Sequence, residues 1–211
     1  LISKGMVYPC VCSRSDVEHA QSAPHAGEDG ARYSGACRDR FQSYAEAAQL
    51  LPHDRLPAWR FRTRPGQMTT FVDGLHGPQS SCVHDEVGDF VIARHAEGAG
   101  YMLAVVVDDA AMGVTEVMRG DDLLPATHRQ ILLAEALGLA SPRYIHVPLI
   151  VGPDGRRLAK RHGDTRISAL RENGVAAETI IAYLAASLDG SRPALPISAT
   201  SLLDTYALGK I

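Results

Sequence analysis

The sequence has no long apolar run and no recognisable export signal. None of its 211 residues falls in a stretch near the ~20 apolar residues that a membrane-spanning helix needs. The opening segment LISKGMVYP lacks the basic and apolar regions of a secretory signal peptide. These absences argue against membrane insertion and secretion, and we expect a cytoplasmic protein.

The sequence also has few cysteines and a small net charge. Four cysteines in a chain without export features favour a metal site or free thiols over disulfides. The net charge is only -3, so any contact with nucleic acid must use local basic patches rather than the field of the whole molecule. The length and a hydrophobic content of 45% suffice for one large domain or two small ones.

The middle of the chain carries the clearest structural pattern. Tyr101–Asp109 is an apolar, β-branched run, which predicts a strand buried on both faces, as in a parallel sheet. Apolar residues at helical spacing over 125–137 predict a helix with Gly138 as its C-cap. Tyr144–Val151 predicts a second strand, and the basic, glycine-containing segment 152–166 follows it. A basic loop at the carboxyl end of such a strand is where α/β sheets bind ligands.

Shorter elements flank this segment. Asp89–Arg94 predicts a strand, and the glycines of HAEGAG predict a turn that joins it to the run at 101–109 as a hairpin. Ser15 or Asp16 is a candidate N-cap of a short helix through Gln21. Four further helices are predicted over 44–51 (capped by Ser43), 167–173, 177–188 and 201–208.

Three of the cysteines lie near one another in the sequence. Cys10 and Cys12 are separated by one residue, and Tyr33 and Cys37 follow a glycine-rich loop. Soft thiolates suit zinc, which prefers four ligands in a tetrahedron. Three cysteines leave the fourth ligand to be found, and the candidates are Tyr33, His19, His25 and a water molecule. Free thiols without a metal are the alternative interpretation.

Three arginines alternate in the segment PAWRFRTRPG. Arg60, Arg62 and Arg64 have the period of a strand, which predicts one arginine face and one apolar face. The arginine face is either a solvated surface with carboxylate partners or a surface that contacts RNA phosphates.

The two segments TEVMRGDDLLPATHRQILLAEALGL and YIHVPLIVGPDGRRLAK resemble the catalytic domain of glutamyl-type class I aminoacyl-tRNA synthetases. The resemblance covers about residues 1–190 and implies an α/β fold, the second half of a Rossmann-type nucleotide fold. RLAKR resembles the KMSKS signature: Lys160 matches its last lysine, while Arg157 and Ala159 replace its first lysine and a serine. The resemblance implies that Lys160 is catalytic and binds ATP, where it and Mg²⁺ neutralise the departing pyrophosphate.

The same resemblance assigns a substrate site. Tyr101 and Arg119 match the residues that hold glutamate, and Asp122 matches an aspartate that holds the loop. Taken without the family, Arg119 is a candidate ion-pair partner of Asp121 or Asp122, and Tyr101 is a candidate core aromatic.

The pattern C-x-C…Y-x₃-C resembles the zinc site of glutamyl-queuosine tRNA(Asp) synthetases, which are truncated relatives of glutamyl-tRNA synthetases. In that family a tyrosine is the fourth ligand. The resemblance therefore implies a structural Zn²⁺ on Cys10, Cys12, Tyr33 and Cys37, and leaves Cys82 as a structural or surface thiol.

That family uses ATP to activate glutamate and transfers it to queuosine in the anticodon of tRNA(Asp). The implied partners are ATP, L-glutamate and tRNA(Asp) carrying queuosine, and we expect a monomer. Nothing in the sequence resembles the anticodon-binding domain of a full glutamyl-tRNA synthetase, which favours the queuosine-modifying relative. The alternatives are a fragment of an ordinary glutamyl-tRNA synthetase and a non-catalytic, zinc-containing module that binds RNA or protein.

The HIGH signature of the family does not occur in these 211 residues. We expect about 80–100 residues to precede residue 1, from typical α/β unit sizes, and we expect the segment alone to be inactive. The expected parts are 1–98, with the end of the first Rossmann half and a zinc-containing acceptor-type insertion; 99–166, with the second half and the KMSKS-like loop; and 167–211, which is helical.

Overall fold

A computed structural model describes residues 1–19, 32–96, 98–152, 154–155, 158, 166–189 and 195–203. The chain divides into two compact units. The larger contains Leu1–Val72, Pro78–Val117 and Leu123–Tyr144, and the smaller contains Asp73–Gly77, Met118–Asp122 and Ile145–Ile211. Among the described residues, no helix combines the length and apolarity that crossing a membrane requires.

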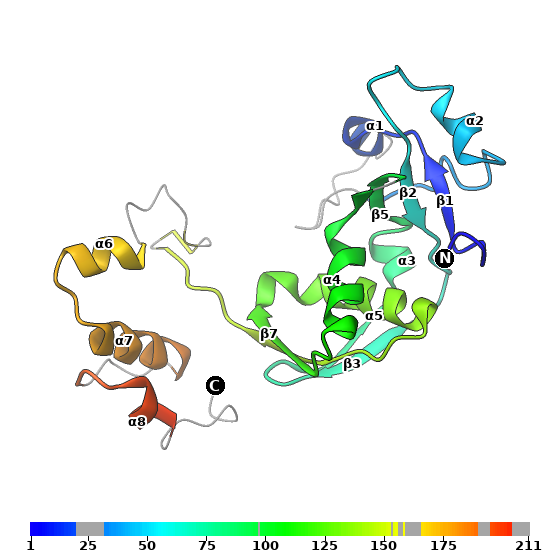
Figure 1. Ribbon diagram of the computed structural model, residues 1–211. Coiled ribbons are helices and arrows are strands. Elements are labelled where there is room, and N and C mark those ends of the chain that lie inside the picture. The colour runs from blue at the N-terminus through cyan, green and yellow to red at the C-terminus, as the bar shows by residue number, and fades with distance from the viewer. Residues whose placement is uncertain are drawn as a thin grey trace. The chain divides into compact units, whose positions relative to one another are not determined.

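The helices and strands follow one another along the chain as in Figure 1. The strands are β1 (Val7–Cys10), β2 (Ala58–Phe61), β3 (Thr69–Asp73), β4 (Gly77–Ser81), β5 (Phe90–His95), β6 (Gly98–Ala99), β7 (Glu116–Gly120) and β8 (Arg143–Val147). The helices are α1 (Arg14–His19), α2 (Tyr44–Ala48), α3 (Val83–Glu86), α4 (Tyr101–Ala111), the 3-10 turn η1 (Asp121–Leu123), α5 (Leu124–Leu137), α6 (Ile167–Glu172), α7 (Ala177–Asp189) and α8 (Ala199–Leu203).

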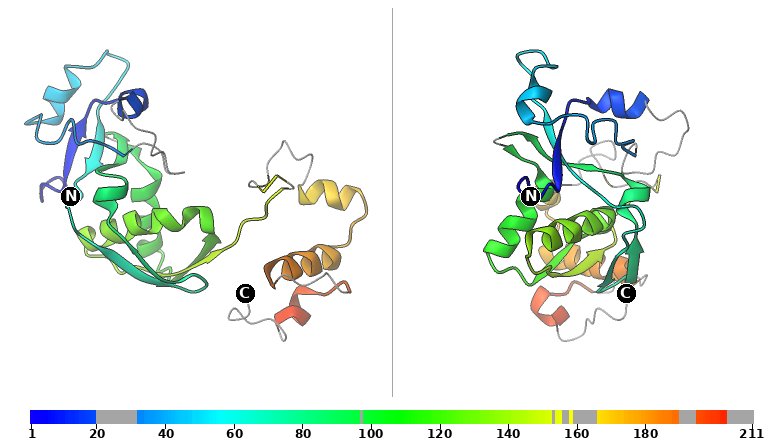
Figure 2. Two further views of the ribbon diagram at one scale, coloured as in Figure 1. Left: turned by 180° about the vertical axis from the view of Figure 1, so that it is seen from behind. Right: turned by 90° about the vertical axis from the view of Figure 1, so that its right-hand side faces the viewer.

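A four-stranded antiparallel sheet organises the larger unit. Its order is β1-β2-β5-β6, and α1 and α2 lie at one end of it in both orientations of the ribbon (Figure 1, Figure 2). Phe61 and Phe90 pack on each other across β2 and β5, with ring centroids 5.3 Å apart. They belong to one buried core with Leu132 and Leu133 of α5 and Val106 of α4. The sheet thus supplies one wall of the core, and α4 and α5 supply another.

The prediction of a buried strand at Tyr101–Asp109 was wrong, because this run forms α4. Met102, Leu103, Val105 and Val106 turn toward the core, a spacing that fits one stripe of a helix as well as a strand. An apolar run of this length does not distinguish the two by periodicity alone. The predicted hairpin is correspondingly reduced to the two residues of β6, which pair with β5.

The helix and the second strand of the predicted strand–helix–strand unit are confirmed, but its first strand is β7 rather than the run at 101–109. Strands β7 and β8 are neighbours in a two-stranded sheet, and α5 lies between them in sequence. Proline sits in the first turn of α5, where it costs no hydrogen bond, and Gly138 ends the helix with φ 73°. The strand β8 ends at Val147, earlier than the predicted end at Val151.

The remaining local predictions differ in detail from the structure. Ser43 caps α2 as predicted, by accepting from the Glu46 backbone. Helix α1 is capped by Ser13, whose hydroxyl accepts from the Asp16 N–H while the Asp16 carboxylate accepts from the Ser13 N–H. Gln21, the predicted end of that helix, lies outside the described residues. The helices α6 and α7 are confirmed, and α8 begins two residues earlier than predicted. Residues 204–208 of that predicted helix lie outside the described residues.

Candidate functional site

The three cysteines of the N-terminal segment come together in the larger unit. The sulfur atoms of Cys10, Cys12 and Cys37 lie within 4.8 Å of one another. The Tyr33 hydroxyl joins them, 3.4 Å from the Cys10 sulfur and 3.8 Å from the Cys12 sulfur, and the Cys12 and Cys37 sulfurs are 3.5 Å apart. All four residues predicted from the sequence therefore converge on one point.

The backbone around Tyr33 explains how its hydroxyl reaches the thiols. The Tyr33 N–H donates to the Val87 carbonyl over 2.9 Å. Next to it, Gly88 has φ +74°, and a side chain there would collide with the Tyr33 carbonyl oxygen. At the other end of the residue, the Cys37 N–H donates to the Tyr33 hydroxyl oxygen over 2.9 Å. Tyr33 is thus held both at its backbone N–H and at its hydroxyl.

The four donor atoms fit a tetrahedral zinc ion. Zn–S bonds of about 2.3 Å and Zn–O bonds of about 2.0 Å place two sulfurs about 3.8 Å apart and a sulfur and an oxygen about 3.5 Å apart. The distances in the cluster lie close to these edges. His19, an alternative ligand, instead contacts Ser15 through Nδ1 at the end of α1, and His25 lies outside the described residues.

Without a metal, the thiols of the cluster differ in acidity. The hydrogen bond with Cys10 lowers the pKa of Cys37 to about 4. The same bond, with burial, raises the pKa of the Cys10 thiol, and burial raises those of Cys12 and Tyr33. A zinc ion would therefore displace protons from the other ligands, since metals bind the deprotonated forms. Cys82, the fourth cysteine, is buried outside this cluster.

The three arginines of the PAWRFRTRPG segment do not share one exposed face. Strand β2 ends at Phe61, and Arg60 is buried, with only 8% of its surface exposed. Arg62 forms an ion pair of 2.7 Å with Asp39, while Arg64 is exposed. Together with Lys4 and Arg38, Arg62 and Arg64 line a surface cavity of about 300 Å³. Phosphate contact by Arg62 and Arg64 stays a prediction, but Arg60 faces inward.

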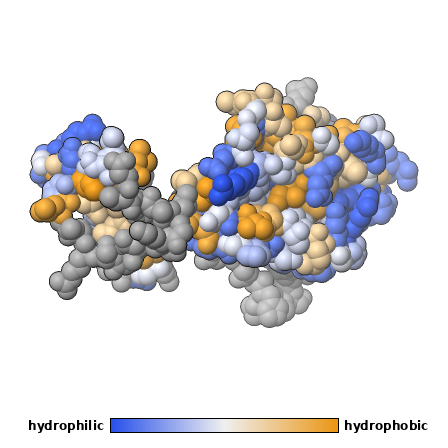
Figure 3. All heavy atoms as spheres, turned by 90° about the horizontal axis from the view of Figure 1, so that it is seen from below, coloured by the Kyte–Doolittle hydropathy of each residue, from blue (hydrophilic) through white to orange (hydrophobic). Residues whose placement is uncertain are grey.

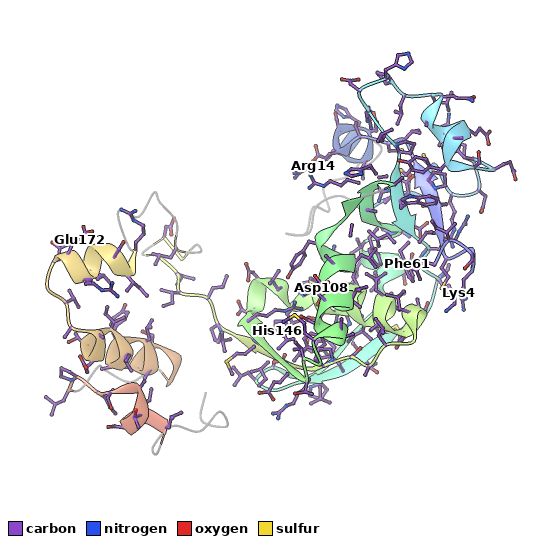
Figure 4. All side chains as sticks on the ribbon, viewed as in Figure 1. Lys4, Arg14, Phe61, Asp108, His146 and Glu172 are labelled. Atoms are coloured by element: carbon purple, nitrogen blue, oxygen red, sulfur yellow. The ribbon has the colours of Figure 1, made fainter. Side chains whose placement is uncertain are left out.

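A second polar cluster, absent from the sequence-based predictions, lies in the smaller unit. The Asp73 carboxylate accepts from His146 Nδ1 over 2.7 Å, and Arg119 Nε donates to His146 Nε2 over 3.0 Å. His146 lies on β8 (Figure 4), and both it and Asp73 have fully buried side chains. Because Nε2 accepts from Arg119, the ring proton must sit on Nδ1. Burial lowers the pKa of His146, which fits this neutral tautomer.

Asp73 is the last residue of β3, and the turn that follows it holds its carboxylate in place. Its carboxylate accepts from the backbone N–H groups of Leu75, His76 and His146. Burial alone would raise the pKa of Asp73, but these hydrogen bonds and that of the His146 ring outweigh it and lower the pKa to about 2. A histidine inside the apolar run YIHVP and an aspartate before Gly74 were the only sequence signals for this pair.

We predict that the Asp73 carboxylate stabilises the fold above about pH 4 and loses this effect as the pH falls toward 2. Its pKa is about 2 when folded and 3.8 in the reference state, so acid protonates the unfolded chain first. The difference corresponds to about 2 kcal/mol. Chemical unfolding from pH 6 to pH 2 should show Asp73→Asn at least this much less stable near neutrality, with the gap closing in acid. Asp108→Asn, on the exposed side of α4, should leave the profile unchanged.

The other predicted site residues are placed as follows. Tyr101 begins α4 and is 58% exposed, so the interpretation as a core aromatic was wrong. Arg119 lies within β7 rather than in a loop after it. Tyr101 belongs to the larger unit and Arg119 to the smaller. Lys160 and Arg157 lie outside the described residues.

Comparison with known proteins identifies the class of protein to which this fold belongs. Residues 1–190 match the family of class I tRNA synthetases (E and Q), catalytic domain, and the chain belongs to this family. A glutamate tRNA ligase from Elizabethkingia meningosepticum, solved in complex with its amino acid, has the same fold. Its TM-score is 0.72 at 22% identity, over 100% of this chain and 46% of the ligase.

Within this family, the chain is similar to glutamyl-Q tRNA(Asp) synthetases. That of Rhodopirellula baltica is 46% identical over 198 residues, which cover 89% of this chain and 58% of the relative. That of Nitratidesulfovibrio vulgaris is 43% identical, over 99% of this chain and 64% of the relative. A glutamate–tRNA ligase of Halorhodospira halophila is 41% identical, over 88% of this chain and 38% of the ligase. The chain thus spans less than two thirds of each relative.

Proposed function

We propose that the whole protein activates glutamate with ATP and transfers it to queuosine in the anticodon of tRNA(Asp). The observation that carries this proposal is the convergence of Cys10, Cys12, Tyr33 and Cys37 on one tetrahedral site, in a chain more than 40% identical to glutamyl-Q tRNA(Asp) synthetases. The substrates are accordingly ATP, L-glutamate and tRNA(Asp) carrying queuosine, and the working form is a monomer.

Glutamate is held by Tyr101 and Arg119. A guanidinium is planar and pairs with a carboxylate through two parallel hydrogen bonds. The bond from Arg119 Nε to His146 fixes the plane of that guanidinium before substrate arrives. Tyr101, exposed at the start of α4, donates its hydroxyl to the same ligand. A guanidinium that is oriented in advance reduces the entropy lost on binding.

Activation is an in-line displacement at phosphorus. The glutamate α-carboxylate attacks the α-phosphate of ATP, and pyrophosphate leaves with the electron pair of the broken P–O bond. By its match to the last lysine of the KMSKS signature, Lys160 is the residue that balances the charge developing on the pyrophosphate. Mg²⁺ on ATP supplies further positive charge to the same phosphates. Most of the catalytic effect is positioning of the carboxylate and stabilisation of charge.

A zinc ion at this site would be structural. Cys10, Cys12, Tyr33 and Cys37 would supply all four of its ligands, which would leave no position for a reactive water. The ion would join β1 to the segment around Cys37. This zinc-containing insertion, the Rossmann half over 99–166 and the helical 167–211 make up the proposed parts of the chain. Contact of Arg62 and Arg64 with RNA phosphate belongs to the same proposal.

The test is glutamate-dependent exchange of pyrophosphate into ATP by the product of the full-length gene. We expect exchange without added tRNA, because by resemblance the queuosine-modifying enzymes activate glutamate alone. The 211-residue segment contains no HIGH tetrapeptide and should show no exchange.

Exchange that needs tRNA would contradict the proposal and indicate an ordinary glutamyl-tRNA synthetase. No exchange with or without tRNA would indicate the non-catalytic binding module. Transfer of labelled glutamate should then be measured on tRNA(Asp) with and without queuosine, since only the modified tRNA should accept it.

A further inference from the structure

Arg60 is a buried guanidinium beside the thiols. Its Nε donates to the Cys10 sulfur over 3.2 Å, and its Nη1 donates to the Asp89 backbone carbonyl over 2.8 Å. Its Cζ lies 3.6 Å from the centroid of the Tyr33 ring. One side chain thus touches two of the four proposed zinc ligands.

The strand geometry explains why Arg60 points inward. Arg60 pairs with Tyr8 of β1, and the register of β2 against β5 shifts between Trp59 and Arg60. The pairing with Tyr8 places Arg60 on the face of the sheet that Tyr8 and Cys10 share, while Phe61 and its partner Val7 face the other core.

A buried positive charge needs a negative partner. In the described part of the chain, no carboxylate forms an ion pair with Arg60. The nearby Asp89 carboxylate instead accepts from the Tyr8 hydroxyl and from Thr63, and pairs with Arg38 at 3.5 Å. The counter-charge of Arg60 is therefore the sulfur cluster.

The net charge of the cluster with zinc bound supports the same conclusion. Three thiolates around a divalent zinc ion leave an excess of negative charge, which a tyrosine oxygen that loses its proton would increase. A guanidinium that donates to one ligand sulfur compensates this excess. A cation over the face of a phenol ring is also attracted by the ring electrons. Arg60 therefore compensates the negative charge of the sulfurs and also lies over the Tyr33 ring.

We propose that Arg60 is a positioning residue of the zinc site, which neutralises the thiolate cluster and holds Cys10 and Tyr33 as ligands. The inference rests on the zinc site of the proposed function. It also separates Arg60 from Arg62 and Arg64: the first serves the metal, and the other two remain on the surface. Lysine can replace Arg60 only in part, because its ammonium keeps the positive charge but lacks the planar group that stacks on Tyr33.

The experiment measures zinc affinity of the reduced protein by competition with a chromophoric chelator. Removal of outer partners of metal ligands lowers affinity roughly 10- to 100-fold. We expect Arg60→Met to show a loss of this size and Arg60→Lys a smaller one. Arg62→Met is the matched control, since Arg62 lies over the Tyr8 ring at 4.8 Å and pairs with Asp39 without contacting a sulfur. Its affinity should stay within about threefold of the original.

Cobalt gives a readout that does not depend on enzyme activity. At saturating Co²⁺, Arg60→Met should alter the sulfur-to-cobalt charge-transfer bands, and Arg62→Met should not. An affinity of Arg60→Met equal to that of the unaltered protein would overturn the inference. So would loss of folding in both Arg60 variants at saturating zinc, because Arg60 would then serve the sheet. An unaltered protein that binds no zinc would instead refute the zinc site of the proposed function.

Discussion

Replacing Arg119 by leucine in the full-length protein is expected to lower kcat/KM for glutamate by roughly 100- to 1000-fold in pyrophosphate exchange. The substrate carboxylate would lose a bidentate, charge-assisted partner and enter the site unpaired. The His146 Nε2 atom, buried and aimed at the guanidinium, would also lose its donor. Steady-state exchange kinetics at varied glutamate and fixed ATP measure the effect.

The matched control is Arg143→Leu on the adjacent strand β8. Arg143 is paired with Glu116 at 3.3 Å, but its side chain is 63% exposed. Exposed pairs contribute about 0–1 kcal/mol, so the exchange kinetics should change less than about fivefold. If Arg119→Leu kept its glutamate KM and kcat, Arg119 would not be the residue that holds the substrate.

The Asp73–His146 pair should act through Arg119. His146→Leu removes the acceptor of the Arg119 Nε–H, whereas the side-chain oxygen of His146→Gln can still accept it. The glutamate KM is expected to rise about tenfold in the leucine variant and less in the glutamine variant, with the ATP KM unchanged. Combined with Arg119→Leu, neither change should add its full effect, since residues in one network are not additive. Additive losses would show that His146 acts independently.

Local capping and turn chemistry made much of the fold predictable. Gly138, the proline at the start of α5 and Ser43 mark their helix ends in the sequence and do so in the structure. The run at α4 was misassigned because valine favours strands, while its burial here comes from packing against α5 and the sheet. Packing of this kind depends on residues far away in sequence, which a local pattern cannot include.

The two parts of the candidate site also differed in how well the sequence predicted them, for a similar reason. The cluster of Cys10, Cys12, Tyr33 and Cys37 was predictable because these residues follow a short pattern in the sequence. The pair Asp73 and His146 is separated by 73 residues in the chain. The inward position of Arg60 depends on its pairing with Tyr8 of β1, which is distant in the sequence. Neither arrangement has a local signature.

The larger unit has a core that is separate from the proposed zinc site, so its folded state should not depend on the metal alone. On the face seen in Figure 3, hydrophobic side chains form small groups among hydrophilic ones. The core around Phe61 and Leu133 contains none of the proposed zinc ligands. These ligands pack instead in a separate buried cluster with Val11 and Phe41. Zinc should therefore stabilise the segment around β1, α1 and Cys37 more than the rest of the unit.

Removing zinc should produce the other large effect. Cys37→Ser is expected to reduce the zinc content from about one ion per chain to near zero. A ligand present at a thousandfold excess over its dissociation constant stabilises a fold by about 4 kcal/mol, so the variant should lose stabilisation of this order. Metal analysis and thermal unfolding with and without chelator measure both quantities. Limited proteolysis should cut first near the cysteines.

Two further variants decide the interpretation of that result. Cys82→Ala alters a buried cysteine outside the cluster and should keep its zinc, with a stability loss of about 1 kcal/mol.

Tyr33→Phe keeps the ring on which Arg60 packs but removes the oxygen 3.4 Å from the Cys10 sulfur. We expect its zinc affinity to fall by roughly 10- to 100-fold, on the scale of other losses around metal ligands. An unchanged affinity would mean that a histidine or a water completes the tetrahedron and that Tyr33 only lines the site.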